Sequence, residues 1–313
     1  MKMYARILVL AALAIFSAGC STVVVVNRTV GLPGLTPLAS ADQVKLVEEG
    51  TPVSQPYQPV GVVTVSEKFW DGPKAPSEDY SYRRMKKYAA DMGADGVIGV
   101  HIASVANKII VLRSGLAVKW LTPGEIKSPV KKPFVVALLP VVVNPEVPLS
   151  HTTPAPTAGK NRTAETPMKP VDKQSAWTAA VNEAVRGPLE LKGYYVLPPE
   201  SATYKGGLEG ARDLNEAELA NLGGDNAHLL LEVAVLNEAR ATIVVSSSAA
   251  VTVKTTLMDK ATRKDVFQGT GTGTVSLGWI ANMIIDKRSA AAAGAAVFAL
   301  DTIDQIGEKV EEK

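Results

Sequence analysis

The chain has 313 residues and a formal net charge of +2, from 33 basic and 31 acidic residues. This balance excludes the strongly basic surface that is typical of nucleic-acid-binding proteins. Hydrophobic residues make up 46% of the chain and aromatic residues 5%, which is enough for two domains with mainly aliphatic cores.

The first twenty residues have the pattern of a secretory signal. Lys2 and Arg6 precede an unbroken apolar run, "ILVLAALAIF", which is followed by small residues and then by Cys20, the only cysteine. The run is shorter than the roughly 20 apolar residues that span a bilayer. A charged start, a short apolar run and small residues together predict a signal peptide over residues 1–19.

The end of this segment, Ala18-Gly19-Cys20, resembles the lipobox of bacterial lipoproteins, with Ser17 where that family usually has Leu. The resemblance implies that Cys20 carries the lipid, including palmitate, and that residues 20–50 form a lipidated N-terminus and tether. Ser21 in place of Asp implies the outer membrane, with the protein facing the periplasm. An ordinary cleaved signal is the alternative. No later stretch of 18 or more apolar residues predicts a second span.

Residues 51–121 are predicted to form a small β-α-β-β domain. Strands are expected over 59–66, 95–105 and 108–120 and a helix over 81–93, with turns near Asn107-Lys108 and Ser114-Gly115. Gly93 is placed to end the helix in the left-handed conformation. The buried stripe of this helix is predicted to be Met85, Tyr88, Ala89 and Met92.

The stretches "GADGVIGV", 93–100, and "GLAV", 115–118, resemble the helix-to-strand junction and the closing strand of the YbjQ-like family. A related domain occurs in an outer-membrane lipoprotein that senses envelope stress, which implies a sensor as an alternative function. The family has also been labelled as heavy-metal binding. His101 has no Cys or His beside it, so we expect a structural histidine and no metal site.

Residues 122–133 are predicted to be a linker, because they contain prolines and lack periodicity. Residues 134–313 are predicted to form a mixed-sheet α/β domain with the order β-α-β-α-β-β-β-α. Its strands are expected over 134–143, 193–198 and 227–236 and in a hairpin around Lys260–Lys264. A Pro/Thr-rich loop is expected over 144–171.

The helices of this second domain are expected from about Lys173, over 214–224 and at the C-terminus. Pro188 is expected to kink the first of them or to start a new turn. The predicted buried stripes are Trp177, Val181, Val185 and Leu189 in the first helix, and Val297, Leu300, Ile303, Ile306 and Val310 in the last.

Pro188-Leu189, the stretch "KGYYV" at 192–196 and Pro198 resemble a family of bacterial lipoproteins of unassigned activity. Leu139-Pro140 and the turn at Asp259–Lys264 match further features of that family. Its fold is similar to the N-terminal domain of TolB, to the curli-secretion lipoprotein CsgG and to LpoB, which activates a penicillin-binding protein. The resemblance implies a periplasm-facing domain that is not an enzyme.

The stretch "GTGTG", 269–273, is predicted to be part of a strand rather than a nucleotide-binding loop, which would lie between a strand and a helix. Alternation places the three glycines on one face, where another backbone could approach closely. The following segment contains Trp and Met, which are enriched in interface cores. The candidate interface is therefore Gly269, Gly271, Gly273, Trp279, Ile280 and Met283; the alternative is that this segment packs under the C-terminal helix.

No motif predicts catalysis. Ser246–Ser248 lack the glycines of a nucleophile elbow, and the three histidines lie in unrelated contexts. Tyr194-Tyr195 could form a binding edge, or a strand with one ring inside. The predicted function is a non-enzymatic envelope lipoprotein that assists secretion, transport or cell-wall processes, with a stress sensor and, least favoured, a hydrolase as alternatives. The expected partners are the membrane, through lipid on Cys20, envelope proteins and further copies of the chain. No cofactor and no nucleic acid are expected.

Overall fold

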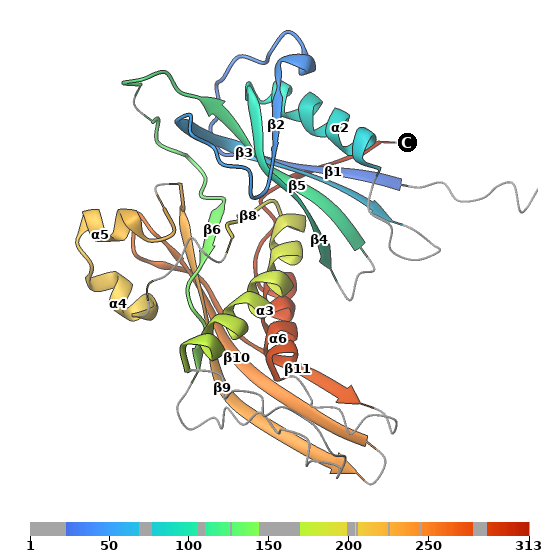
Figure 1. The fold of residues 1–313 in the computed structure, drawn as a ribbon, viewed down its shortest axis with the longest axis vertical. Helices are drawn as coiled ribbons and strands as arrows, with labels where there is room; N and C mark the ends of the chain where they lie inside the picture. The colour runs from blue at the N-terminus through green and yellow to red at the C-terminus, as the bar shows by residue number, and fades with distance from the viewer. Residues whose placement is uncertain are drawn as a thin grey trace, which may run out of the picture.

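The computed structural model describes residues 23–68, 77–105, 110–125, 127–143, 170–198, 204, 206–224, 226–243, 246–277 and 287–312. These residues form two mixed sheets and five α-helices, which confirms the predicted α/β class. Figure 1 shows the two sheets at opposite ends of the molecule, with α3 and α6 side by side between them. Among the described residues, no helix is both long and apolar enough to cross a bilayer.

The first sheet, sheet A, has six strands in the order β12-β1-β3-β5-β4-β2. All neighbours are antiparallel except β2 and β4. Helix α2 packs on one face, and the short 3-10 helix η1 precedes β2. The bounds are β1 Val23–Val30, η1 Ala41–Gln43, β2 Lys45–Glu48, β3 Tyr57–Lys68, α2 Glu78–Asp91, β4 Gly96–Val105, β5 Ile110–Trp120 and β12 Glu308–Glu312.

The second sheet, sheet B, has the order β11-β10-β9-β6-β8, with β7 also paired to β9. Alternating side chains of its central strands pack under α3 and α6 on one face and under α4 and α5 on the other. The bounds are β6 Val135–Leu138, β7 Val142–Val143, α3 Pro170–Leu191, β8 Tyr195–Val196, α4 Gly207–Asp213, α5 Glu216–Asn221, β9 Leu229–Ile243, β10 Ser246–Asp259, β11 Asp265–Leu277 and α6 Lys287–Asp301.

The predicted order β-α-β-β is found as β3-α2-β4-β5 in sheet A, which also takes in β1 and β2 from the expected tether and β12 from the end of the second expected domain. Two of the predicted buried stripes are confirmed. In α2, Met85 and Ala89 are fully buried, and Gly93 follows the helix with a positive φ of 76°. In α3, Val181, Val185 and Leu189 are fully buried, and the helix continues past Pro188 to Leu191. The 3.6-residue repeat of apolar side chains therefore located the faces of both helices.

Three predictions of local structure are wrong. The turn near Ser114-Gly115 does not exist, because β5 runs through it; Gly115 instead leaves room for α2, since a Cβ there would lie 2.9 Å from Met85 Cε. The strand expected over 134–143 divides into β6 and β7 around Pro140, which has no N–H for a sheet hydrogen bond. The helix expected over 214–224 is shorter, ends at Asn221 and is preceded by α4.

The C-terminal helix also differs from its prediction. Helix α6 ends at Asp301, and Val310 lies on β12, where it pairs with Val26 of sheet A. Val297 is 43% exposed, and the buried side of α6 consists mainly of alanines and Phe298. The amphipathic pattern failed here because α6 is apolar on every side from residue 290 to 300, so the sequence does not mark one face.

The glycines of β11 face α6. Gly271 and Gly273 are buried, whereas Thr270, Thr272 and Thr274 are exposed, as the alternation predicted. A Cβ at Gly271 would lie 2.1 Å from the carbonyl oxygen of Gly294 on α6. The backbone that approaches the glycine face is therefore a helix of the same chain.

Gly271→Val is expected to destabilise the protein by about 1–3 kcal/mol, because the added side chain overpacks the contact between β11 and α6. Thr272→Val, on the outward face of the same strand, is the control and should change stability by less than about 0.5 kcal/mol. Chemical denaturation followed by circular dichroism measures both. Equal stability of the two variants would show that α6 does not rest on β11.

Candidate functional site

A cluster of charged side chains lies between the two sheets. Arg186 and Glu190 are one turn apart on the last part of α3, where the helix meets sheet A. His101 belongs to β4, and Glu49 follows β2 directly. Gly187 makes the approach possible, since a Cβ there would lie 2.1 Å from the carbonyl oxygen of Ser104 on β4.

A bulge in β4 aims His101 at α3. The pairing of β4 with β5 shifts between Ile98 and His101, and Gly99 has a positive φ of 60°. Glycine adopts this conformation without strain, and bulges commonly redirect a side chain. The Gly99 carbonyl accepts hydrogen bonds from His101 Nδ1 at 2.7 Å and from the Tyr195 hydroxyl at 3.0 Å.

The charged groups bind one another in a chain. His101 Nε2 lies 2.9 Å from Glu190 Oε1, and Arg186 Nε lies 3.4 Å from the same oxygen. Arg186 Nη1 donates to Glu49 Oε2 at 3.1 Å, and Arg186 Nη2 also contacts that carboxylate. Because His101 faces a carbonyl and a carboxylate, both of its ring nitrogens can donate. A protonated His101 balances the cluster at two positive and two negative charges.

Burial increases from Glu49 inward. The Glu190 side chain has no exposed area, the His101 side chain 5% and the Glu49 side chain 32%. Burial lowers the pKa of His101, but the charge and hydrogen bond of Glu190 outweigh it and raise the pKa above 6.5. Burial raises the pKa of Glu49, but the hydrogen bond and charge of Arg186 outweigh it and lower the pKa below 4.5.

Hydrogen bonds between uncharged groups also join sheet A to the end of α3. Thr29 Oγ1 on β1 donates to the Gly193 carbonyl at 2.7 Å, and Asn27 Nδ2 donates to the Leu191 carbonyl at 2.6 Å. These carbonyls lie at the end of α3, where intrahelical partners run out. Side chains of sheet A thus complete the hydrogen bonding of a helix that packs on sheet B.

The arrangement of the cluster suits a joint between the sheets. The carboxylate of Glu190 is enclosed, and the groups within reach of it are His101 and Arg186. Removing one member of such a buried pair leaves an uncompensated charge inside the protein, which is costly. The cluster can therefore hold α3 in one position on sheet A.

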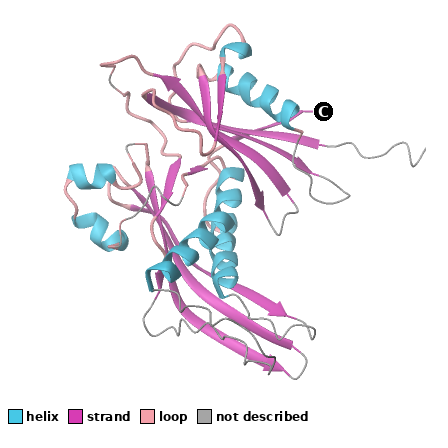
Figure 2. Cartoon of the chain, viewed as in Figure 1, coloured by secondary structure: helices cyan, strands magenta, loops and turns pink. Residues whose placement is uncertain are grey.

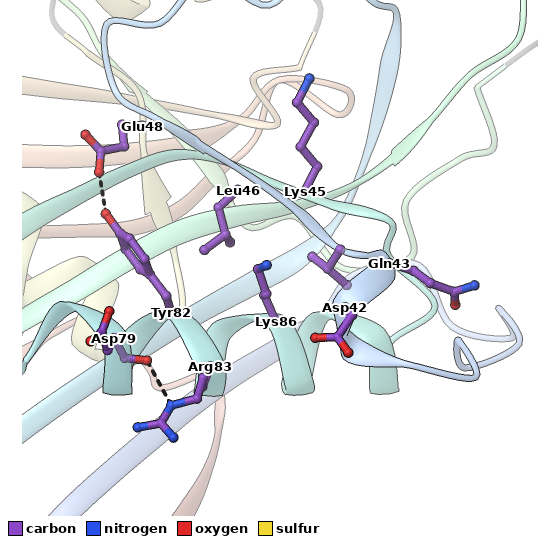
Figure 3. A pocket seen from close by; sticks show the side chains of 10 residues that line it. Asp42, Gln43, Lys45, Leu46, Glu48, Asp79, Tyr82, Arg83 and Lys86 are labelled. Carbon is purple, nitrogen blue, oxygen red and sulfur yellow. Dashed lines mark hydrogen bonds between the residues drawn. The ribbon is translucent and has the colours of Figure 1, made fainter.

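A separate groove of about 880 Å³ lies between β2 and α2 (Figure 3). Tyr82 on α2 donates to Glu48, and Arg113 lies under the Tyr82 ring, 5.1 Å from its centroid. Burial, followed by the hydrogen bond to Glu48, raises the pKa of Tyr82 to about 12. The charged side chains lining the groove are three acidic, Asp42, Glu48 and Asp79, and three basic, Lys45, Arg83 and Lys86. This balance selects neither an anion nor a cation.

The other residues singled out in the sequence lie apart from this cluster. Cys20, Trp279, Ile280, Met283 and most of the 144–171 loop lie outside the described residues. The glycines Gly269, Gly271 and Gly273 lie under α6 and not at a free face. Tyr194 and Tyr195 are both buried, so their strand offers no aromatic edge to a partner. His228 accepts from the Val135 N–H at 3.2 Å, and no three metal-ligating side chains gather within the described ranges.

Within the charged cluster, only His101 could be singled out from the sequence, as a structural histidine without its partners. One signal was present: Arg186 and Glu190 are four residues apart, and Glu190 adjoins the buried stripe at Leu189. An acidic residue beside a buried helix face indicates a buried ion pair. Glu49 follows an edge strand and has no such signal.

No family model matches the chain, and no curated protein matches it. Solved structures show limited similarity. Among them are CT253 from Chlamydia trachomatis (15% identity, 47% of this chain and 74% of that chain, TM-score 0.28) and lipoprotein GNA1162 from Neisseria meningitidis (16% identity, 46% and 84%, TM-score 0.29). PelC from Paraburkholderia phytofirmans, solved as a dodecamer, is 20% identical over 55% of this chain and 88% of that chain, with a TM-score of 0.27. These structural similarities are distant, and one of the three proteins, GNA1162, is a lipoprotein.

Glu190→Gln is expected to destabilise the protein by about 3–5 kcal/mol, because it leaves the charge of His101 buried without its counter-charge and leaves Arg186 with Glu49 alone. Glu308→Gln removes one partner of the exposed pair with Arg28, whose N–O distance is 3.0 Å, and should cost less than about 1 kcal/mol. Urea denaturation compares the two. Similar losses would contradict a role of the cluster as the joint.

The two described histidines are expected to respond to pH with opposite sign. His101 has a raised pKa, so its contribution to stability is present below pH 6.5 and is lost as pH rises through the raised value. Burial and the charge of Lys260 lower the pKa of His228 to about 4, so its contribution is present above pH 6.5 and is lost as pH falls toward 4. NMR titration of the imidazole protons, assigned with His101→Gln and His228→Gln, measures both. A His101 pKa below 6.5 would be incompatible with the ion pair to Glu190.

Proposed function

We propose that this chain is a non-enzymatic lipoprotein of the bacterial cell envelope, anchored to the outer membrane through Cys20 and docking on envelope proteins. The observation that carries the proposal is the position of Cys20. It is the only cysteine, and it directly follows a charged, apolar and small-residue leader. Acylation is a use for a single thiol that needs no second cysteine.

The start of the first sheet supports this proposal. Residues 21 and 22 alone separate Cys20 from Val23, the first residue of β1. Three residues extend over about 10 Å at most, so a lipid on Cys20 would hold sheet A at the membrane surface. Sheet B lies at the far end of the molecule from the start of β1 (Figure 1) and would project away from the anchor.

The charged residues of the interior also support a role other than catalysis. A general acid or base must reach its substrate within hydrogen-bond distance, and Glu190 is enclosed by its protein partners. Two sheets that are held together by buried charges keep their outer surfaces in fixed positions, as a protein that docks on partner proteins requires. The proposal also includes two resemblances. Residues 134–313 would resemble the TolB N-terminal, CsgG and LpoB domains, and residues 51–121 would resemble the YbjQ-like family.

Cys20→Ala is expected to abolish uptake of radiolabelled palmitate and to move the protein from the membrane fraction to the soluble fraction. Three acyl chains exceed the two signals that stable anchoring requires. Ser21→Ala is the control and should keep both label and membrane location. Unchanged labelling of Cys20→Ala would refute the anchor.

Crosslinking in intact cells tests docking with the same pair of variants. A specific heterologous adduct should form with the Ser21→Ala protein and decrease with the Cys20→Ala protein, because the anchor confines the chain to its partner's membrane. Adducts that form only after an envelope stress would favour the sensor instead.

A further inference from the structure

Among the described residues, the outer edge of β11 is an unpaired sheet edge. β11 pairs with β10 on one side, and no strand of the described ranges pairs with its other side (Figure 2). Edge strands are usually guarded against pairing by charges, prolines or bulges. The stretch "QGTGTGTVS", 268–276, contains no charge and no proline, and its pairing with β10 runs without a register shift.

Helix α6 extends this unprotected surface. Residues 290–300 are all apolar, yet only part of the helix is covered, by α3 on one side and by β10 and β11 beneath. Val297 is 43% exposed, and Ala293, Ala296 and Leu300 are half-buried. A helix that is apolar on all sides is ordinarily buried on all sides, so the described structure leaves an apolar flank beside the β11 edge.

We propose that a second copy of this chain pairs with β11, antiparallel, about a two-fold axis at Thr272. In that register Thr272 lies opposite its own copy, and Gly271 lies opposite Gly273 of the partner subunit. All glycines stay on the α6 face in both copies, and all threonines stay on the other face. The α6 flanks then meet beside the joined strands, where Val297 becomes covered.

Two features favour a second copy over an unrelated strand. The alternation of Gly and Thr is symmetric about Thr272, so one surface complements itself, as a two-fold interface requires. One cross-strand threonine pair already exists within the chain, because Thr252 Oγ1 lies 3.2 Å from Thr272 Oγ1 across β10 and β11. Pairing of the two β11 strands would add a second threonine at Thr272 without placing like charges opposite each other.

The proposed interface uses the edge of β11 rather than its glycine face. The glycine face is filled by α6 through the close contact of Gly271 with Gly294. The hydrogen-bonding groups along the outer side of β11 are left for a partner. The inference is independent of the lipid on Cys20.

Light scattering of the full chain in detergent, corrected for bound detergent, tests the assembly. The unaltered protein is expected to contain two chains per particle. Val297→Lys should weaken association by at least about tenfold, because it places a charge in each copy on the apolar flank that the interface would bury. Leu236→Lys is the matched control, since Leu236 is also 43% exposed but lies on β9, and it should leave the dimer intact. A monomeric unaltered protein, or a Val297→Lys protein that remains dimeric, overturns the proposal.

Cysteine crosslinking tests the register and does not depend on the tolerance of α6 for lysine. In a Cys20→Ser background, Thr272→Cys is expected to form a disulfide-linked dimer by itself, and Thr270→Cys is expected to link to Thr274→Cys when the two are mixed. Thr262→Cys, in the exposed turn before β11, should stay unlinked. Absence of links at all three strand positions, or equal linking at Thr262, overturns the proposal. Loss of the lipid anchor leaves these outcomes unchanged, so failure here is distinct from failure of the anchor.

Discussion

The carboxylate of Glu190 is the group on which the relation between the two sheets depends. It sits on a helix that covers sheet B, yet its charge is met by His101 of sheet A and by Arg186, which in turn reaches Glu49 after β2. A charge without water has to be balanced by its neighbours. A small shift of α3 along sheet A would therefore separate these charges, even where it exposed little apolar surface. The ion pairs thus fix the position of α3 more precisely than hydrophobic packing could.

The contact between α3 and sheet A depends on glycines as much as on the charged side chains. Gly187 lets α3 touch β4, and Gly99 lets the bulge turn its carbonyl toward two donors. The same device recurs in sheet B, where Gly271 and Gly294 bring β11 and α6 into backbone contact. At Gly187 and at Gly271 the helix lies closer to the strand than a Cβ would permit, and the polar or apolar contacts around it follow from that distance.

The sequence predicted the elements whose apolar pattern has a period and missed those whose position is set by distant partners. The stripe of α3 could be found because Val181, Val185 and Leu189 recur on one face. The side of α6 that is buried could not, because alanine and valine occupy every side of it. The bulge at Gly99 has a local signal in the glycine itself, whereas the ion pair of Arg186 with Glu49 joins segments 137 residues apart. A strand at 308–312 was also missed, since four of its five residues are charged and they pair with β1 only in the folded protein.

Because of strand β12, sheet A cannot be completed until the end of the chain has been synthesised. Val24 pairs with Glu312 and Val26 with Val310, so sheet A is closed by residues that are made almost a full chain length after its first strand. Contacts of such sequence separation form slowly, because the entropy of closing the loop is lost before the contact forms. During synthesis, one edge of β1 would therefore stay unpaired until residues 308–312 have been made, and a chaperone that shields this edge would act on the N-terminal half of the chain.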